Sequence, residues 1–321
     1  MLHIICPNTA IDVRIELDQF ARGEVQRATD SIGYASGKGV NSAFTCDFLG
    51  IPSNLHAMVG ALDEDYFTAC KFTDVDAFLS LFPGETRRNL TIVDQEGLVA
   101  HVQTSGFSVD EVGVDNFLQK TCAKIKNGDV ALVSGSLPEG FEHTKLFELV
   151  SKIRELGAIV VLDTDLYRID QNSGLEIDFV KPNIEELKAY LKRHSISELG
   201  TALKRLADLG VKHTIVTCGA KGAYIFSADS GRVHFTQSNF ENSGKEAIGS
   251  GDAFIGAFSA LLSKGGSQVT AIKHAISAGH SNIFHAGPGR IGETFHSILG
   301  NASCQELNRQ AVLRQISEIL R

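Results

Sequence analysis

Short apolar runs alternate with amphipathic stretches along most of this sequence. Buried strands are predicted at the apolar runs 2–6, 55–59, 129–134, 158–163, 179–181 and 213–218. Helices are predicted at the amphipathic stretches 38–49, 145–156 and 197–209. Each of these stretches is followed by a glycine (Gly50, Gly157 or Gly210), which is the usual C-terminal stop. Strands that alternate with helices are typical of βα units, so we predict an α/β fold with a mainly parallel sheet.

Two segments depart from this pattern and alternate apolar and polar residues instead. They lie at 11–34 and 87–104, and Glu96-Gly97 offers a turn inside the second one. Such alternation is typical of half-exposed antiparallel strands. We expect both segments, extended to about 11–35 and 86–106, to form a small β-sheet lid inserted in a single domain that spans 1–321. Sheets inserted in this way often cover a substrate site.

Composition narrows the class of protein. The chain has 321 residues, of which 43% are hydrophobic and 21% charged, so it can bury a large core and is not disordered. Its net charge is −8 and we find no basic stripe, which argues against a nucleic-acid partner. A few local Lys and Arg side chains can still hold a phosphorylated substrate in an acidic protein.

The cysteines and the apolar runs bear on the compartment. None of the six cysteines lies within three residues of another, so there is no C-x-x-C metal or redox motif. Scattered cysteines of this kind indicate a reducing cytoplasm. No run approaches the roughly 18 apolar residues of a membrane helix, and the N-terminus lacks the features of a signal peptide. We expect a cytoplasmic protein with no membrane partner.

The strongest chemical motif is Gly249-Ser250-Gly251-Asp252, a glycine-rich turn that leads into an apolar helix. Its glycines let the backbone approach a ligand, and free N–H groups at a helix start favour an anion. A charged Asp252 beside such a turn suits a general base for a hydroxyl that attacks a phosphoryl group. The alternative is a tight helix entry in which Asp252 is only the cap.

A second glycine-rich segment runs from Ser36 to Asn41. It matches neither the Walker A loop nor G-x-G-x-x-G. Gly37 could bring the backbone close to sugar hydroxyls, Asn41 could supply amide contacts and Lys38 could hold a charge. A glycine turn that caps a helix is the alternative.

Three strand ends and one arginine pair complete the candidates. After the strand at 179–181, Asn183 and Glu186 have the spacing of a capping box, or they hold magnesium directly or through water. The ends of two other strands, Ser134 to Pro138 and Thr217 to Gly222, lie where α/β enzymes place ligands. Arg87 and Arg88, on the predicted lid, are candidate phosphate clamps.

In combination and in this order, the motifs resemble the ribokinase-like, PfkB-type carbohydrate kinases, in particular the group that acts on phosphorylated sugars. The resemblance runs from about Ile4 to the helix after Asp252, and more weakly to the C-terminus. The matching segments are Asn8-Thr9-Ala10-Ile11-Asp12, Gly23-Glu24-Val25, Ser36-Gly37-Lys38-Gly39-Val40-Asn41, Glu85-Thr86-Arg87-Arg88-Asn89, Thr104-Ser105-Gly106-Phe107, Ser134-Gly135-Ser136-Leu137-Pro138, Lys181-Pro182-Asn183 and Gly249-Ser250-Gly251-Asp252.

The resemblance implies a three-layer α/β/α core with a β lid, and it implies ATP and Mg²⁺ as cofactors. It implies Asp252 as general base, with the N–H groups of the three preceding residues as an anion hole. The implied sugar-phosphate contacts are Asp12, Gly37, Lys38, Asn41, Ser136 and, for the phosphate already on the sugar, Arg87. The implied nucleotide contacts are Lys181, Asn183, Thr217, Gly219 and Gly222, with Glu186 as the magnesium residue. The lid is also implied as a dimer interface.

The sequence departs from the family pattern at Ser36, His101, Glu246 and Ala247. We expect ATP-dependent phosphorylation of a ketose phosphate, with fructose 1-phosphate as the first candidate. Tagatose 6-phosphate and fructose 6-phosphate are the competing substrates. A sugar-phosphate sensor that kept the fold without catalysis is the alternative of another class, and an NAD-dependent oxidoreductase is set aside because G-x-G-x-x-G is missing after the first strand.

Overall fold

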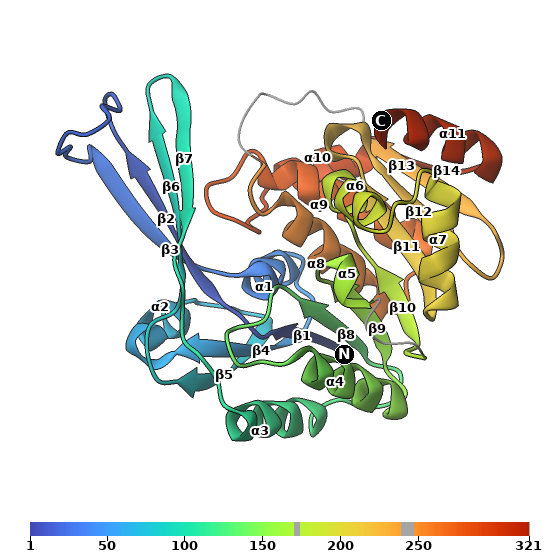
Figure 1. Ribbon diagram of the computed structural model, residues 1–321, viewed down its shortest axis with the longest axis horizontal. Coiled ribbons are helices and arrows are strands. Elements are labelled where there is room, and N and C mark those ends of the chain that lie inside the picture. The colour runs from blue at the N-terminus through green and yellow to red at the C-terminus, as the bar shows by residue number, and fades with distance from the viewer. Residues whose placement is uncertain (170–173, 239–246, 321) are drawn as a thin grey trace.

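Two separate β-sheets organise the molecule. A computed structural model describes residues 1–169, 174–238 and 247–320. Figure 1 shows a large sheet with helices on both faces and a smaller sheet that stands apart from this body. The strand order of the large sheet is β14-β13-β12-β11-β10-β9-β8-β1-β4-β5. The bounds are β1 (Leu2–Cys6), β4 (Ser53–Gly60), β5 (Val75–Phe82), β8 (Val130–Ser134), β9 (Ile159–Asp163), β10 (Ile177–Val180), β11 (Val211–Thr217), β12 (Ala223–Ser227), β13 (Val233–Ser238) and β14 (Ala302–Leu307).

The six predicted buried strands are all present, as β1, β4, β8, β9, β10 and β11, and they pair in parallel. The sequence pattern did not identify β5, a parallel edge strand whose middle is partly exposed. It also did not identify β12, β13 and β14, which add an antiparallel extension at the other end. These strands depart from the alternation of strand and helix on which the prediction was based. The sheet is therefore mainly parallel, as expected.

Helices cover both faces because neighbouring residues of the parallel strands are both apolar. Ile4 packs on one face and Ile5 on the other, and both are fully buried. One face is covered by α3 (Glu111–Cys122), α4 (His143–Glu155), α6 (Ile184–Arg193), α7 (Leu199–Asp208) and α11 (Arg309–Leu320). The other is covered by α1 (Lys38–Phe48), α8 (Ser250–Ser263) and α9 (Gln268–Asn282). The shorter helices are α2 (Glu64–Thr68), α5 (Leu166–Ile169), α10 (Thr294–Gly300) and the 3₁₀ turns Ala61–Asp63 and Gly219–Lys221.

The three predicted helices are α1, α4 and α7, and the predicted glycine stops are confirmed. Gly50, Gly157 and Gly210 have φ values of 63°, 79° and 93°. This left-handed conformation lets a glycine end a helix at little steric cost.

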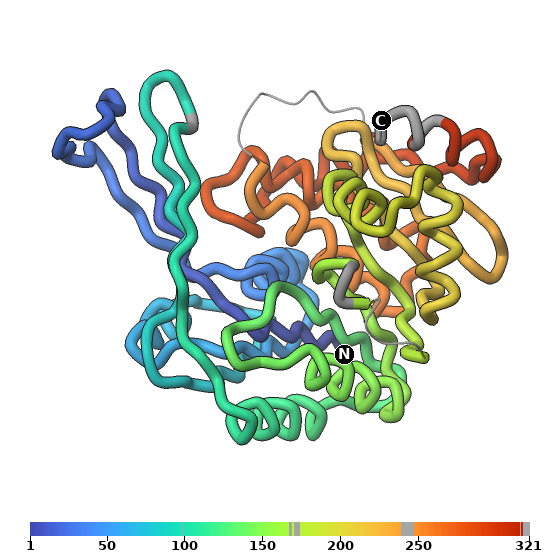
Figure 2. The backbone as a smooth tube through the Cα atoms, viewed as in Figure 1, coloured from blue at the N-terminus to red at the C-terminus, as the bar shows by residue number. Residues whose placement is uncertain are grey.

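The smaller sheet consists of two hairpins in the order β3-β2-β6-β7. They are β2 (Ala10–Glu16) with β3 (Asp30–Ser36), and β6 (Arg88–Asp94) with β7 (Gly97–Gln103). Each hairpin is antiparallel, as predicted, whereas β2 and β6 pair in parallel and join the two. We call this four-stranded sheet the lid sheet; Figure 2 shows it projecting away from the helical body.

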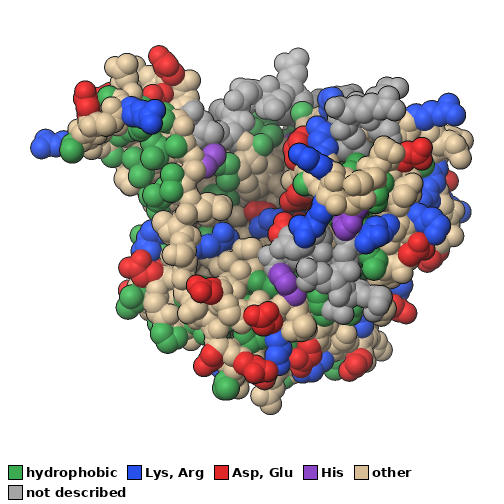
Figure 3. Space-filling view, in the orientation of Figure 1, with side chains coloured by type: hydrophobic (Ala, Val, Ile, Leu, Met, Phe, Trp, Pro, Cys, Tyr) green, Lys and Arg blue, Asp and Glu red, His purple; other side chains and the backbone are tan. Residues whose placement is uncertain are grey.

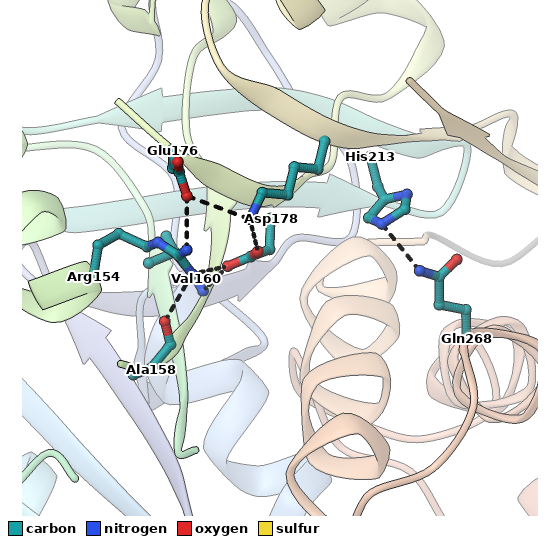
Figure 4. A network of polar contacts seen from close by, with 8 residues as sticks. Arg154, Ala158, Val160, Glu176, Asp178, His213 and Gln268 are labelled. Atoms are coloured by element: carbon teal, nitrogen blue, oxygen red, sulfur yellow. Dashed lines mark hydrogen bonds and ion pairs between the residues drawn. The ribbon is translucent and has the colours of Figure 1, made fainter. Parts of the chain in front are cut away.

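Ion pairs stabilise the amino-terminal ends of the central strands, at the opposite edge from the candidate site. Figure 4 shows Arg154 of α4 close to Glu176 and Asp178, at N–O distances of 2.9 and 2.7 Å. Asp178 also accepts a hydrogen bond from the backbone N–H of Val160. This network fixes α4 against β9 and β10 and takes no part in the site described below.

Two further observations concern the compartment. All six cysteines lie in the described residues and have free thiols. Among the helices of the described residues, none is long and apolar enough to cross a bilayer.

A buried histidine pair lies at the same amino-terminal edge. His3 Nδ1 is 3.2 Å from His56 Nε2, and His3 Nε2 is 3.2 Å from Asp129 Oδ2. Burial, with smaller contributions from His3 and Lys124, lowers the pKa of His56 to about 3. Burial also lowers the pKa of His3, although Asp129 opposes the shift.

We predict that this pair weakens the fold in acid. Between pH 6.5 and about 3 the unfolded chain binds a proton at His56 that the folded chain does not, so the free energy of unfolding falls as pH falls through that window. His56→Phe should flatten the dependence, measured by urea unfolding at several pH values. His101→Gln, at an exposed lid position, is the matched control. Equal slopes for the wild-type protein and His56→Phe would contradict the prediction.

Candidate functional site

The candidate site lies where the carboxyl ends of the central parallel strands meet the start of α8. Asp163 ends β9, Lys181 follows β10, and Asp252 lies in the first turn of α8. Lys38 and Asn41 come from α1, which packs beside α8. Figure 3 shows that acidic and basic side chains gather in the hollow between the lid sheet and the helical body. This edge is where open α/β sheets place ligands.

Asp252 is held by a side chain from α1. Asn41 Nδ2 donates to Asp252 Oδ2 at 2.8 Å, and Ser36 Oγ donates to Asn41 Oδ1 at 3.1 Å. The N-cap of α8 is Gly249, with φ of 82° and no side-chain capping bond. Asp252 is therefore not the cap of its helix. The capping alternative considered for this residue is wrong, and its carboxylate is aimed at another part of the chain.

Burial raises the pKa of Asp252 to about 6. Lys38, Asn41 and Lys181 oppose this effect, while the neighbouring charge of Asp163 adds to it. A carboxylate with a pKa just below neutrality can accept a proton efficiently, because it is ionised at neutral pH and still has appreciable basicity. The geometry thus gives Asp252 the properties of a general base.

Asp163 is a second buried carboxylate, and it holds two lysines in the site. Its Oδ1 lies 3.2 Å from Lys181 Nζ and 3.4 Å from Lys38 Nζ, and its Oδ2 accepts from Ser134 Oγ at 3.3 Å. Burial alone would raise the pKa of Asp163, but the two lysines hold it below its ordinary value. Asp163 in turn raises the pKa of Lys38, against the effect of burial. Lys38 therefore stays charged.

The predicted anion hole consists of three backbone amides, those of Gly249, Ser250 and Gly251. The Ser250 N–H already donates to the Ala247 carbonyl at 3.1 Å. For the amides of Gly249 and Gly251, by contrast, we find no backbone acceptor in the described parts of the chain. Within the described residues, the start of α8 therefore presents two N–H groups without a backbone acceptor next to Asp252, with the positive end of the helix dipole behind them. Glu246 lies outside the described residues.

Asn183 and Glu186 form the capping box that their spacing predicts. Asn183 Oδ1 accepts from the Glu186 N–H at 2.8 Å, and Glu186 Oε2 accepts from the Asn183 N–H at 2.9 Å. The second Glu186 oxygen, Oε1, is 3.9 Å from Lys38 Nζ and makes no hydrogen bond within the described residues. The capping role leaves this oxygen available on the side of the site.

These donors fit a magnesium ion that arrives with a nucleotide. Mg²⁺ in phosphate-transfer sites is usually held by one or two carboxylates, phosphate oxygens and water rather than by a full protein cage. Glu186, a partly exposed carboxylate with one unused oxygen, is of that type. No group of three or more His, Cys, Asp or Glu side chains within the described residues forms a cage for a metal ion.

The lid residues meet the site at the base of the lid sheet. Asp12 of β2 accepts from Asn89 Nδ2 of β6 at 2.7 Å, which connects the two hairpins. Arg87 donates through Nε to the Thr9 carbonyl at 3.2 Å and has no carboxylate partner among the described residues. Arg88 behaves differently, because it is paired with Asp63 at 2.9 Å. Arg87 is thus the arginine of the pair that keeps its charge available.

The remaining predicted residues lie along the same edge of the sheet. Gly37, with φ of 113°, starts α1, and a Cβ there would lie 2.9 Å from Thr9 Cα. Ser136 follows β8 and accepts from Asn8 Nδ2 at 3.0 Å. Thr217 ends β11 and donates its N–H to the Pro182 carbonyl, beside Asn183.

The nucleotide candidates after β11 form a tight turn. Gly219 and Gly222 have φ values of 58° and 108°, and Cys218 N–H donates to the Gly222 carbonyl at 2.8 Å. In the described part of the chain, no hydrogen bond or ion pair joins this turn to Asp252 or Asp163. The structure therefore brings Lys181, Asn183 and Thr217 to the charged cluster, and it leaves Gly219 and Gly222 farther along the edge.

A cavity of about 240 Å³ lies between the lid sheet and the loop before α10. Asp12, Arg14, Tyr34 and Thr91 of the lid line one side, and Asn282, His285 and Pro288 are among the residues of the other side. Sequence reasoning did not assign Tyr34, His285 or Asp163 to the site. Only Asp163 gave a local signal, as the last residue of a predicted strand, and its lysine partners could not be found from spacing.

Comparison with known proteins yields a consistent result. A family model described as "pfkB family carbohydrate kinase" matches residues 4–293. A 1-phosphofructokinase of Bacillus subtilis is 23% identical over 290 residues, which cover 88% of this chain and 93% of the relative. A tagatose-6-phosphate kinase of Staphylococcus epidermidis is 25% identical over 300 residues and covers 91% of this chain and 94% of the relative.

Solved structures share the fold. The phosphofructokinase-2 from Escherichia coli in complex with potassium aligns with a TM-score of 0.82 at 20% identity and covers 93% of this chain and 98% of that chain. An Arabidopsis thaliana ribokinase complexed with ribose and ATP aligns with a TM-score of 0.69 at 17% identity, again over 93% and 98%. The ribokinase-like fold is thereby established for this chain.

Proposed function

This chain belongs to the pfkB family of carbohydrate kinases, and on that premise we propose that it transfers the terminal phosphoryl group of ATP to a hydroxyl of a ketose phosphate. The observation that carries the proposal is the position of Asp252. Its carboxylate is ionised near neutral pH and is oriented by Asn41. It belongs to the first turn of α8, where the amides of Gly249 and Gly251 have no backbone acceptor among the described residues. We treat 1–321 as one kinase domain whose lid segments are about 11–35 and 86–106.

In the proposed mechanism Asp252 removes the proton from the attacking hydroxyl. The sugar oxygen then forms a bond to the γ-phosphorus of ATP while the bond from that phosphorus to the bridging oxygen breaks. ADP leaves with the electron pair of that bond. Asp252 keeps the proton until solvent removes it.

The chain's own charges stabilise the transfer. Negative charge spreads over the phosphoryl oxygens in the transition state, so donors fixed around them lower the barrier. The amides of Gly249 and Gly251, the predicted anion hole with Ser250, and the ammonium of Lys38 supply such donors. Magnesium bound with ATP would add neutralising charge on the phosphate oxygens, and Glu186 would hold it, directly or through water.

We propose that the nucleotide binds at the carboxyl ends of β10 and β11, on the other side of Asp163 from Lys38. Lys181, Asn183 and Thr217 lie together there, and Gly219 and Gly222 continue the edge. The glycines, both at positive φ, give a turn that can approach phosphates or the ribose closely.

The proposed sugar is phosphorylated, and fructose 1-phosphate is our first candidate. Several similar relatives carry the name 1-phosphofructokinase. Arg87 supports a phosphate on the sugar because its charge is not used by a carboxylate. Tagatose 6-phosphate and fructose 6-phosphate are the competing substrates. The sensor alternative is disfavoured, since ligand binding alone would not need a raised pKa at Asp252.

We also propose a cytoplasmic location, where ATP is available and the six free thiols would stay reduced.

Asp252→Asn should abolish the transfer while preserving the shape of the side chain. Without the base we expect kcat to fall by roughly 10²–10⁴-fold. The measurement is ADP release from Mg-ATP with fructose 1-phosphate, tagatose 6-phosphate, fructose 6-phosphate, fructose and ribose. Asp208→Asn, at an exposed position of α7 where the carboxylate pairs with Lys204, is the control. A fully active Asp252→Asn enzyme would contradict the mechanism.

The same carboxylate should set the acid limb of the pH profile. The base is active when deprotonated, so kcat/KM should fall as pH decreases through about 6. Asn41 lowers the pKa of Asp252 by its hydrogen bond, so Asn41→Ala should move the acid limb to higher pH. A limb that stays in place in Asn41→Ala would show that another group titrates.

Arg87→Ala should weaken binding of the phosphorylated sugar and leave ATP binding unchanged. We expect KM for the sugar phosphate to rise by about tenfold or more, because one charge-assisted contact is lost. Arg88→Ala is the matched control, since its charge is already paired with Asp63. Equal losses for sugar and ATP would argue against the phosphate role of Arg87.

We further propose a homodimer through the lid sheet. Both outer strands of this sheet expose apolar side chains: Ile32 of β3 is 42% exposed and Val102 of β7 is 46% exposed. Sedimentation should show a dimer that Ile32→Asp or Val102→Asp dissociates. Val112→Asp, at a 67% exposed position on α3, should have no effect. A monomeric wild-type protein would refute the proposal.

A further inference from the structure

A second cavity, of about 460 Å³, lies beside the base of the lid sheet. It is bordered by β3, α1, α2 and the segment after α2, and by Arg290 in the glycine-rich loop before α10. The lining residues used below are Tyr34, Phe44, Tyr66, Lys71 and Arg290. Tyr34 also lines the 240 Å³ cavity of the candidate site, so one side chain borders both spaces.

Arg290 is a partly buried cation that no anion among the described residues neutralises. Its guanidinium carbon lies 3.9 Å from the ring centroid of Phe44 and 5.1 Å from that of Tyr34. Its Nη1 is buried and has no hydrogen-bond partner in the described parts of the chain. Asp65 also lines the cavity but makes no ion pair with Arg290.

Stacking on two rings compensates only part of the cost of burying this charge. Burial lowers the pKa of Arg290, and the ionisable groups that oppose the shift are the Cys70 thiol and the Tyr34 phenol. Burial raises the pKa of the Cys70 thiol, so this thiol is neutral near pH 7. Among the described residues, the guanidinium therefore has no anionic partner at this cavity.

We propose that this cavity binds the phosphate group of a small phosphorylated molecule or of inorganic phosphate, at a site separate from the substrate site. Arg290 offers a positive charge at the cavity wall, through the guanidinium nitrogens other than its buried Nη1, and the exposed Lys71 offers a second positive charge. A pair of cations suits a ligand with two negative charges, such as a phosphate dianion, better than a ligand with one, such as a carboxylate. Tyr66, 43% exposed, offers a ring on which an attached organic group can lie.

The loop that carries Arg290 connects this cavity to the proposed anion hole. Asn282 Nδ2 donates to the carbonyls of Gly287 and Arg290, at 3.1 and 2.9 Å, and Ser250 Oγ donates to Asn282 Oδ1 at 3.3 Å. A Cβ at Gly249 would lie 2.6 Å from Gly289 N. A bound anion that fixes Arg290 against β3 thus acts on the loop behind α8, and it also acts on Tyr34 in the wall of the sugar cavity.

The test measures anion binding by isothermal titration calorimetry on the full chain at constant ionic strength. The probes are inorganic phosphate, glycerol 3-phosphate and adenosine 5′-monophosphate, which separate a free anion from an ester and from a nucleotide. Arg290→Met keeps an apolar side chain against Phe44 and removes the charge. Lys71→Ala changes an exposed residue and guards against a folding defect in Arg290→Met. Arg87→Ala removes the candidate phosphate contact of the substrate site.

We expect the dissociation constant of at least one probe to rise by roughly 10- to 100-fold in Arg290→Met and less in Lys71→Ala, and to stay unchanged in Arg87→Ala. Binding that is lost in Arg87→Ala and kept in Arg290→Met would assign the anion to the substrate site and overturn the proposal. Absence of binding by all three probes would overturn it as well. These outcomes do not depend on which sugar is phosphorylated.

The coupling has its own readout. At a probe concentration that saturates the wild-type enzyme but not Arg290→Met, KM for the sugar substrate should change by about fivefold in the wild-type enzyme and not in Arg290→Met. Binding without any change in KM would remove the coupling and leave an isolated site.

Discussion

The site depends on one buried arrangement of charge, in which the Asp163 carboxylate lies between the ammonium groups of Lys38 and Lys181. A lone carboxylate at this depth would take up a proton, because burial raises its pKa. Here the two ammonium groups hold the pKa of Asp163 below its ordinary value, and Asp163 in turn raises the pKa of Lys38. The two positive charges then act on Asp252, where they counter the effect of burial and keep the pKa of this carboxylate near 6 rather than higher. The same lysines that satisfy Asp163 are the charges available to an incoming phosphate.

Close backbone approach places α1 against α8 and so makes this arrangement geometrically possible. A Cβ at Gly256 of α8 would lie 2.9 Å from the Ser42 carbonyl oxygen, and one at Gly39 would collide with Cys6 of β1. Because these positions lack a side chain, α1 can lie low over the sheet and beside α8. Asn41 then reaches Asp252, and Ser42 Oγ donates to the Asp252 carbonyl at 2.9 Å. Packing and chemistry therefore depend on the same glycines.

The sequence was informative wherever a signal is local. Apolar runs marked the central parallel strands, and glycines marked the ends of α1, α4 and α7. The motif around Asp252 and the capping box at Asn183 could also be read directly. The pairing of Asp163 could not, because Lys38 is 125 residues away in the chain and only the fold brings the two together. The parallel pairing of β2 with β6 could not be read from the sequence either. Alternation of apolar and polar residues predicts a strand and its two faces but not which strand lies beside it. Arg87 and Arg88 are adjacent in sequence, and only their surroundings show that Arg88 is neutralised by Asp63.

The parallel joint between β2 and β6 has a mechanical consequence. The lid sheet is connected to the body by four chain crossings, which are the links from β1 to β2, from β3 to α1, from β5 to β6 and from β7 to α3. A flap on one hinge swings freely, whereas a sheet anchored at four points can only bend, and its displacement grows with distance from the anchors. Asp12 and Arg87 lie next to the anchors, so bending of the sheet changes their positions relative to Asp252 very little. Phe20 and Val25, at the far end, travel the most. The proposed substrate contacts are thus decoupled from the motion of the tip, so loops at the tip can change in length or sequence without altering the chemistry proposed at the base.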